Sequence, residues 1–164
     1  CTCGSFVGGI KWAETQMAAL TKATGLPATS TSLSIITAIK EFGADTVDLI
    51  SPYPPRLTSN LLAFLQESNI YVAALVTLSC LEPEESDDLE LRSEVKKFDK
   101  ILAKRSHPLV IPDTAISAIG LIPQLEKDIN RPIIAANQAT LWNSLNLMDI
   151  TVRTKKGGSL FSSK

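Results

Sequence analysis

The sequence predicts an α/β fold in which a mainly parallel sheet lies between two layers of helices. Short apolar, β-prone runs alternate along the chain with longer segments of helical periodicity. No hairpin signal lies between successive runs, and strands that are separated by helices pair in parallel. Together these observations predict a three-layer α/β sandwich.

Four apolar runs have the profile of buried strands, and they span 46–50, 70–78, 108–111 and 132–136. A fifth, shorter strand is predicted at 27–30. Apolar periodicity predicts helices over 12–24, 32–42, 56–67, 89–105, 115–129 and 139–147. We also expect a solvated acidic loop at 82–88 and a poorly ordered tail at 155–164.

The composition is that of an ordinary soluble globular protein. Its 164 residues suffice for one sizeable domain or two small lobes, and 45% are apolar and 20% charged. A net charge of −1 gives no reason to expect nucleic acid or an anionic membrane as partner. No apolar run approaches the roughly 20 residues that span a bilayer. The three cysteines do not form the even set of a disulfide framework, which indicates reduced thiols in a cytoplasm.

The chain begins at Cys1, without a methionine. A mature lipoprotein, a processed N-terminal-nucleophile hydrolase and a fragment of a longer protein could each begin in this way. A lipoprotein normally continues into a polar tether, whereas a segment of structured composition follows here at once. We favour the fragment, with a strand missing before Cys1.

Ligands of parallel α/β sheets bind beyond the carboxyl ends of the strands, which indicates residues 1–5, 51–53, 112–114 and 137–140. The positive end of a helix that begins near residues 8 and 9 would favour the thiolate of Cys1. The hydroxyls of Thr2 and Ser5, with backbone N–H groups, could hold a carboxylate or an enolate oxygen. The structural alternative is a tight turn of small buried residues.

The other segments offer polar side chains that also have structural explanations. Tyr53 could donate to a carboxylate or cover the core above a proline turn. Asp113 or Thr114 could act in catalysis or cap the following helix. Asn137 could bind substrate or cap the last helix.

Two further residues suggest no chemistry. His107, the sole histidine, precedes a strand at the opposite end of the sheet, and nothing resembles a metal-ligand cluster, so we expect no metal. We interpret Cys80 as a half-buried residue without a catalytic role. The glycine pair at 8 and 9 lacks the spacing of a nucleotide-binding loop, so we expect no cofactor.

Three short segments together resemble one family. Residues 1–6, CTCGSF, are similar to the CTSGSF stretch that holds the first active-site cysteine of maleate isomerase-like proteins. Residues 51–53, SPY, resemble their TPY turn, and residues 132–142, PIIAANQATLW, are similar to their PVISSNQATLW. By these segments the chain is identified as a member of the aspartate/glutamate racemase superfamily, in its maleate isomerase and arylmalonate decarboxylase branch.

The resemblance implies two similar racemase-type α/β lobes with the active site between them. Residues 26–137 would form the second lobe. Residues 1–25 and 138–164 would be the remainder of a first lobe that is incomplete, because the N-terminal part of a full-length relative would be absent.

By the same resemblance, two cysteines face each other across the cleft and act on opposite faces of the substrate carbon. Cys1 matches the first, whereas Asp113 stands where the second should be. A carboxylate and a thiolate are not the matched pair that reaction through two thiols needs, so Asp113 departs from the family's pattern. Cys3 replaces the serine of CTSGSF. The residues implied to bind the substrate are Thr2, Cys3, Tyr53, Thr114 and Asn137.

These observations predict a cysteine-dependent, cofactor-independent isomerase or decarboxylase of a small dicarboxylate or related carbonyl acid. Cys1 and Asp113 would be its catalytic residues. A non-catalytic racemase-fold protein that binds a small acid is the main alternative, and an N-terminal-nucleophile hydrolase is another. The expected partner is a small carboxylic acid, and a homodimer is one assembly open to the protein.

Overall fold

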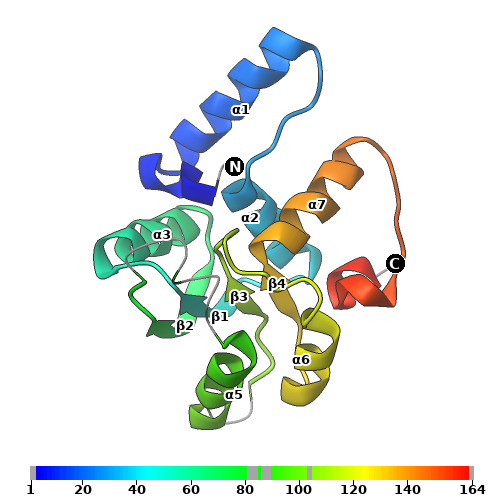
Figure 1. The fold of residues 1–164 in the computed structure, drawn as a ribbon. Coiled ribbons are helices and arrows are strands. Elements are labelled where there is room, and N and C mark those ends of the chain that lie inside the picture. The colour runs from blue at the N-terminus through cyan, green and yellow to red at the C-terminus, as the bar shows by residue number, and fades with distance from the viewer. Residues whose placement is uncertain (1–2, 81–84, 86–89, 103–104, 163–164) are drawn as a thin grey trace.

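The computed structural model describes residues 3–80, 85, 90–102 and 105–162. Its sheet has four parallel strands in the order β2-β1-β3-β4 (Figure 1). They are β1 (Thr46–Ser51), β2 (Tyr71–Thr77), β3 (Leu109–Ile111) and β4 (Ile133–Ala135). The four main predicted strands and their parallel pairing are confirmed.

Helices cover both faces of the sheet, so the predicted three layers are confirmed (Figure 1). Leu49 of β1 belongs to one core cluster and the next residue, Ile50, to the other, because successive strand residues point to opposite faces. One face carries α2 (Thr31–Glu41), α3 (Pro55–Glu67) and α7 (Ala136–Leu147), and the other carries α5 (Leu91–Ile101) and α6 (Ile122–Ile129).

The helix α1 (Ile10–Thr24) projects away from the sheet (Figure 1). It follows a short 3₁₀ helix, η1 (Cys3–Gly8). Along its length α1 buries Ala13 and Met17, whereas Trp12 and Leu20 are 49% and 46% exposed. This helix therefore leaves apolar side chains uncovered.

Three predicted elements differ from the structure. Residues 27–30 form no strand, and Ser30 instead caps α2 by accepting the Leu33 N–H at 3.3 Å. The helix predicted from residue 115 begins at Ile122, because turns occupy the residues before it. The strand β2 lies at the edge of the sheet rather than buried within it, and Tyr71 is 73% exposed.

The prediction of a poorly ordered tail is wrong for residues 155–162. The 3₁₀ helices η2 (Lys155–Gly157) and η3 (Ser159–Phe161) pack near α6, and Leu160 is fully buried. The Glu126 carboxylate holds this tail by accepting the Ser159 N–H at 2.8 Å and the Ser159 hydroxyl at 2.5 Å.

The acidic loop predicted at 82–88 lies, apart from Glu85, outside the described residues. Within the described ranges, no helix combines the length and the apolar character that crossing a bilayer requires.

Candidate active site

The carboxyl ends of β1, β3 and β4 lie at one edge of the sheet, because these strands are neighbours and run in parallel. The segments that follow them are 52–54, 112–114 and the first turn of α7. Each of the three segments contains a residue indicated by the sequence, namely Tyr53, Asp113 and Asn137. The structure joins these segments by hydrogen bonds between side chains and backbone carbonyls.

Tyr53 links the segment after β1 to the segment after β3. Its hydroxyl donates to the carbonyl of Pro112 at 3.0 Å. Its ring also packs on Phe6 of η1, with a centroid separation of 5.4 Å and an interplanar angle of 37°. The half-buried Tyr53 therefore connects two strand ends with the segment that follows Cys1.

Asp113 is half-buried and does not cap a helix. Its Oδ1 accepts the Ala115 N–H at 3.0 Å, which closes an Asx turn, and α6 begins only at Ile122. The carbonyl of the next residue, Thr114, accepts the Asn137 side-chain amide at 2.9 Å. The interpretation of Asp113 as an N-cap is therefore wrong, and its carboxylate stabilises a turn instead.

Asn137 lies within the first turn of α7, so it is not the cap of that helix either. The residue that satisfies the helix start is Gln138, whose Oε1 accepts the Ala135 N–H at 3.0 Å. The Gln138 Nε2 donates to the carbonyl of Gly157 at 2.7 Å, which ties α7 to the C-terminal tail. The exposed Asn137 side chain takes no part in the cap and donates to the Thr114 carbonyl instead.

The N-terminal part of the predicted site is only partly described. Cys1 and Thr2 lie outside the described residues, and Cys3 is described by its backbone alone, as the first residue of η1. A carboxylate from α3 already occupies the N-terminus of α1, because the Ile10 N–H donates to Glu67 Oε2 at 2.8 Å. The first turn of α1 therefore has a partner of its own and offers that donor to no substrate.

Ser5 could hold a carboxylate or be a small buried residue of a turn, and the structure agrees with the second alternative. Its hydroxyl is buried and donates to the Ser30 hydroxyl at 2.9 Å. The partner is the cap of α2, so this hydrogen bond fastens η1 to α2.

Cys80 lies nearer to the candidate site than its position in the sequence suggests. Its N–H donates to the carbonyl of Pro52 at 2.7 Å, directly beside Tyr53. Leu78 similarly donates to Ser51 at 2.8 Å, so the segment after β2 runs along the segment after β1. The thiol is free and half-buried.

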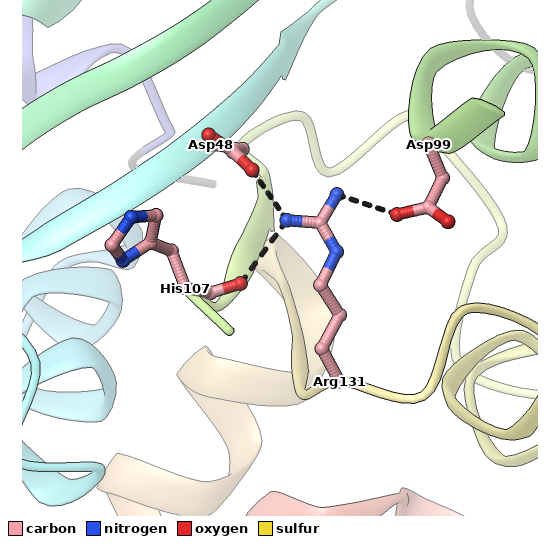
Figure 2. A network of polar contacts seen from close by, with 4 residues as sticks. All are labelled: Asp48, Asp99, His107 and Arg131. Carbon is pink, nitrogen blue, oxygen red and sulfur yellow. Dashed lines mark hydrogen bonds and ion pairs between the residues drawn. The ribbon is translucent and has the colours of Figure 1, made fainter. Parts of the chain in front are cut away.

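A charged network lies near the opposite, amino end of the same strands (Figure 2). The Arg131 guanidinium pairs with Asp48 of β1, donates to the His107 carbonyl at 3.1 Å and lies 3.0 Å from an Asp99 oxygen of α5. Asp48 and Arg131 are both buried. Because the pair is closed to solvent, we assign it a structural role. Among the described residues, no group of acidic, histidine or cysteine side chains could hold a metal ion.

The sequence of residues 1–161 matches the family described as arylmalonate decarboxylase. The chain belongs to the arylmalonate decarboxylase family. This result confirms the branch indicated by the three sequence segments.

Two curated relatives are similar over most of this chain. A maleate isomerase of Geobacillus stearothermophilus is 24% identical over 156 residues, which are 92% of this chain and 61% of the relative. An arylmalonate decarboxylase of Bordetella bronchiseptica is 23% identical over 162 residues, which are 96% of this chain and 67% of the relative. The chain thus spans less than two thirds of the length of the first of these relatives.

Solved structures show that the family fold is shared. A liganded double mutant of arylmalonate decarboxylase superposes with a TM-score of 0.91 at 22% identity, over 100% of this chain and 71% of that one. A maleate cis-trans isomerase of Nocardia farcinica with a covalently bound succinylcysteine intermediate has a TM-score of 0.85 at 19% identity, over 100% of this chain and 69% of that one.

Proposed function

We propose that this protein isomerises or decarboxylates a small dicarboxylate or related carbonyl acid, with Cys1 and Asp113 as its catalytic residues. The observation that carries the proposal is the family match over residues 1–161, since both curated relatives are named as enzymes of these two kinds. The hydrogen-bonded segments around Asp113 support it, because they hold a carboxylate at the edge where parallel α/β proteins bind ligands.

Cys1 would act as a thiolate. In an isomerisation its sulfur would add to one carbon of the double bond, and the displaced electron pair would move toward the neighbouring carboxylate as an enolate. Rotation about the new single bond and loss of the sulfur would restore the double bond. The succinylcysteine in the Nocardia farcinica isomerase supports such an addition step.

In a decarboxylation the bond to one carboxylate would break, carbon dioxide would leave, and an enolate would take up a proton. Asp113 in its carboxylic acid form would give this proton on the face opposite Cys1, and solvent would protonate the carboxylate again. Thr2, Cys3 and Thr114, with backbone N–H groups, would hold the substrate carboxylates. Tyr53 and Asn137 would join them, Asn137 through its second side-chain N–H and Tyr53 by turning its hydroxyl from the Pro112 carbonyl to the substrate.

The division into lobes stays a prediction, and the uncovered apolar side chains of two helices support it. Trp12 and Leu20 of α1, and Leu147 at the end of α7, are partly exposed although they are large and apolar. A neighbouring lobe would cover these faces, which agrees with assigning 1–25 and 138–164 to an incomplete first lobe beside 26–137. A homodimer and a cytoplasmic location also stay predictions.

The alternative of a non-catalytic protein that binds a small acid is favoured by one observation. The Asp113 carboxylate accepts the Ala115 N–H, which is a structural task that a binding protein would also need.

The test is a substrate panel with the protein at its full natural length. Maleate, arylmalonates and 2-hydroxy acids are incubated in D₂O, and conversion is followed by proton NMR for the wild type, Cys1→Ser and Cys80→Ser. We expect conversion of at least one acid, a loss of roughly 10²-fold or more in Cys1→Ser, and less than about twofold in Cys80→Ser. Turnover that Cys1→Ser leaves unchanged would remove this thiol from the mechanism.

A further inference from the structure

The helix α1 is capped by a side chain from another helix. The residue before it, Gly9, has no side chain to offer, and the Ile10 N–H donates to Glu67 Oε2 of α3 at 2.8 Å. A carboxylate at a helix N-terminus satisfies a free N–H group and meets the positive end of the helix dipole. Glu67 therefore replaces a local N-cap, although it lies 57 positions from Ile10.

The glycine pair before α1 allows this contact. A Cβ at Gly9 would lie 3.1 Å from Glu67 Oε2, and the φ of 80° at this position also favours glycine. A Cβ at Gly8 would lie 2.6 Å from the Trp12 ring. The pair, which lacks the spacing of a nucleotide-binding loop, thus lets the backbone approach the carboxylate of α3 closely.

We infer that Glu67 is a positioning residue for the segment that holds Cys1, and that it acts by clamping the end of η1 onto α3. The 3₁₀ helix η1 lies beside α2 and α3 (Figure 1). Its end is closed by the Gly9 N–H, which donates to the Phe6 carbonyl at 3.0 Å, and the Phe6 ring packs on Tyr53 at a centroid separation of 5.4 Å. A contact that fixes the residues after η1 on α3 therefore also fixes how η1 meets the carboxyl edge of the sheet.

The segment needs this clamp because the rest of α1 does little to hold it. The side chains that α1 buries are Ala13 and Met17, and the helix projects away from the sheet (Figure 1). The helix η1 is six residues long, and 3₁₀ hydrogen bonds have poorer geometry than those of an α-helix. A catalytic nucleophile has to be held within a fraction of an ångström, so a fixed point beside η1 matters for Cys1.

The inference rests on the proposed function only for its catalytic consequence, so its first test needs no substrate. Glu67→Ala removes the acceptor, whereas Glu67→Gln keeps one acceptor oxygen. We expect amide hydrogen exchange at Ile10 and Gly9 to accelerate about fivefold in Glu67→Ala, the ratio that a lost N-cap typically gives, and to change less than about twofold in Glu67→Gln. Gln66→Ala, at the neighbouring exposed position of α3, is the matched control and should change neither.

Two results of this exchange experiment would overturn the inference. Unchanged exchange in Glu67→Ala would show that the carboxylate holds nothing. Acceleration at Ile10 alone would show that Glu67 caps α1 without holding the end of η1.

A second test without substrate follows the thiol itself. Alkylation of Cys1 by iodoacetamide near neutral pH should slow about threefold relative to Cys80 in Glu67→Ala, since a thiol that moves away from backbone donors returns toward its ordinary protonated state. Cys80 is the internal reference because its thiol is free and it follows β2 rather than η1. Glu67→Gln should label like the wild type. An unchanged ratio in Glu67→Ala would contradict the positioning of Cys1.

The third test measures catalysis. With a substrate found for the wild type, kcat should fall about tenfold in Glu67→Ala while KM stays within about twofold, and Glu67→Gln should restore kcat. A rise in KM at constant kcat, or an unchanged kcat, would overturn the inference. If the wild type converts no acid while exchange and alkylation change as stated, the proposed function fails and the role of Glu67 stands.

Discussion

The two ends of the sheet are built differently, although the same strands contribute to both. Near the amino end, Asp48, Arg131 and Asp99 form a charged network whose central pair is closed to solvent. At the carboxyl end, neutral donors such as Tyr53 and Asn137 hold half-buried backbone turns. The amino end is therefore held by a buried ion pair, whereas the carboxyl end is held by neutral hydrogen bonds between turns.

The two ends differ in the free energy that it costs to open their interactions. A buried ion pair tolerates no rearrangement, since separating its members leaves a charge without water or a partner. Neutral hydrogen bonds to carbonyls near the surface can open at a cost of about 1 kcal/mol each. A carboxylate that must meet substrate is better served by the second arrangement. Substitutions at the amino end should therefore change stability, and substitutions at the carboxyl end should change activity.

The largest effect is expected from Arg131→Met. The substitution leaves the Asp48 carboxylate buried without its partner, which typically costs about 3–5 kcal/mol of unfolding free energy. Urea denaturation measures the loss. Below the melting temperature of the variant, its kcat should equal that of the wild type, because the candidate active site lies at the other end of the strands.

The double variant Asp48→Leu/Arg131→Met is the control for this prediction. Replacing both charges by apolar side chains should recover most of the stability lost in Arg131→Met. If the double variant were as unstable as the single one, packing rather than the unpaired charge would explain the loss.

A smaller effect is expected from Glu126→Gln. This carboxylate accepts the Ser159 N–H and hydroxyl and the Ile133 N–H at 3.0 Å, and an amide group would turn one acceptor into a donor. We expect a loss of about 1–3 kcal/mol, measured by thermal denaturation. Glu14→Gln on the exposed face of α1 is the matched control and should change stability little. Equal melting temperatures of the two variants would show that the hydrogen bonds of the Glu126 carboxylate contribute nothing to stability.

The smallest effect is expected from the exposed ion pair between Lys96 of α5 and Asp128 of α6. A hydrogen bond from Lys96, with another from Gln124, lowers the pKa of the Asp128 carboxyl below its ordinary value of 3.8. A lowered pKa in the folded state means that the stabilisation is present above the unfolded pKa and is lost as the pH falls through the folded one.

NMR titration of Lys96→Met should therefore show the pKa of Asp128 rising toward 3.8, and the stability difference from wild type should vanish in strong acid. Lys97→Met, which removes the partner of Glu94 instead, should leave the pKa of Asp128 in place. An unchanged Asp128 titration in Lys96→Met would contradict the assigned cause.

The layer architecture could be predicted because it depends on local patterns. The runs at 46–50 and 132–136 are short, mostly apolar and bounded by turn residues or helical segments, which favours strands, and parallel pairing then brings 112–114 and Asn137 to one edge. The Asp48–Arg131 pair could not be predicted in this way, since its members lie 83 positions apart and Asp48 interrupts an apolar run. Its one signal was a charged residue inside a predicted buried strand.

The order of the C-terminal tail could not be predicted from its composition. Glycine and serine are typical of disordered segments, whereas here the glycines are needed for the packing of the tail. Gly158 has a φ of 76°, a conformation that favours glycine. A Cβ at Gly157 would lie 2.6 Å from the Phe161 ring, so a larger residue would not fit. Similarly, the apolar residues after Asp113 resemble a helix in their spacing, but the chain forms turns there until Ile122.

The measurement that tests the account most directly is the turnover of Asp113→Asn in the full-length protein, on whichever acid the wild type converts. Asparagine can still accept the Ala115 N–H, so the turn and the melting temperature should be kept. Without the carboxylate, kcat should fall by roughly 10²-fold or more. A variant that keeps both its melting temperature and its full turnover would contradict the catalytic role of Asp113 and leave it a turn residue.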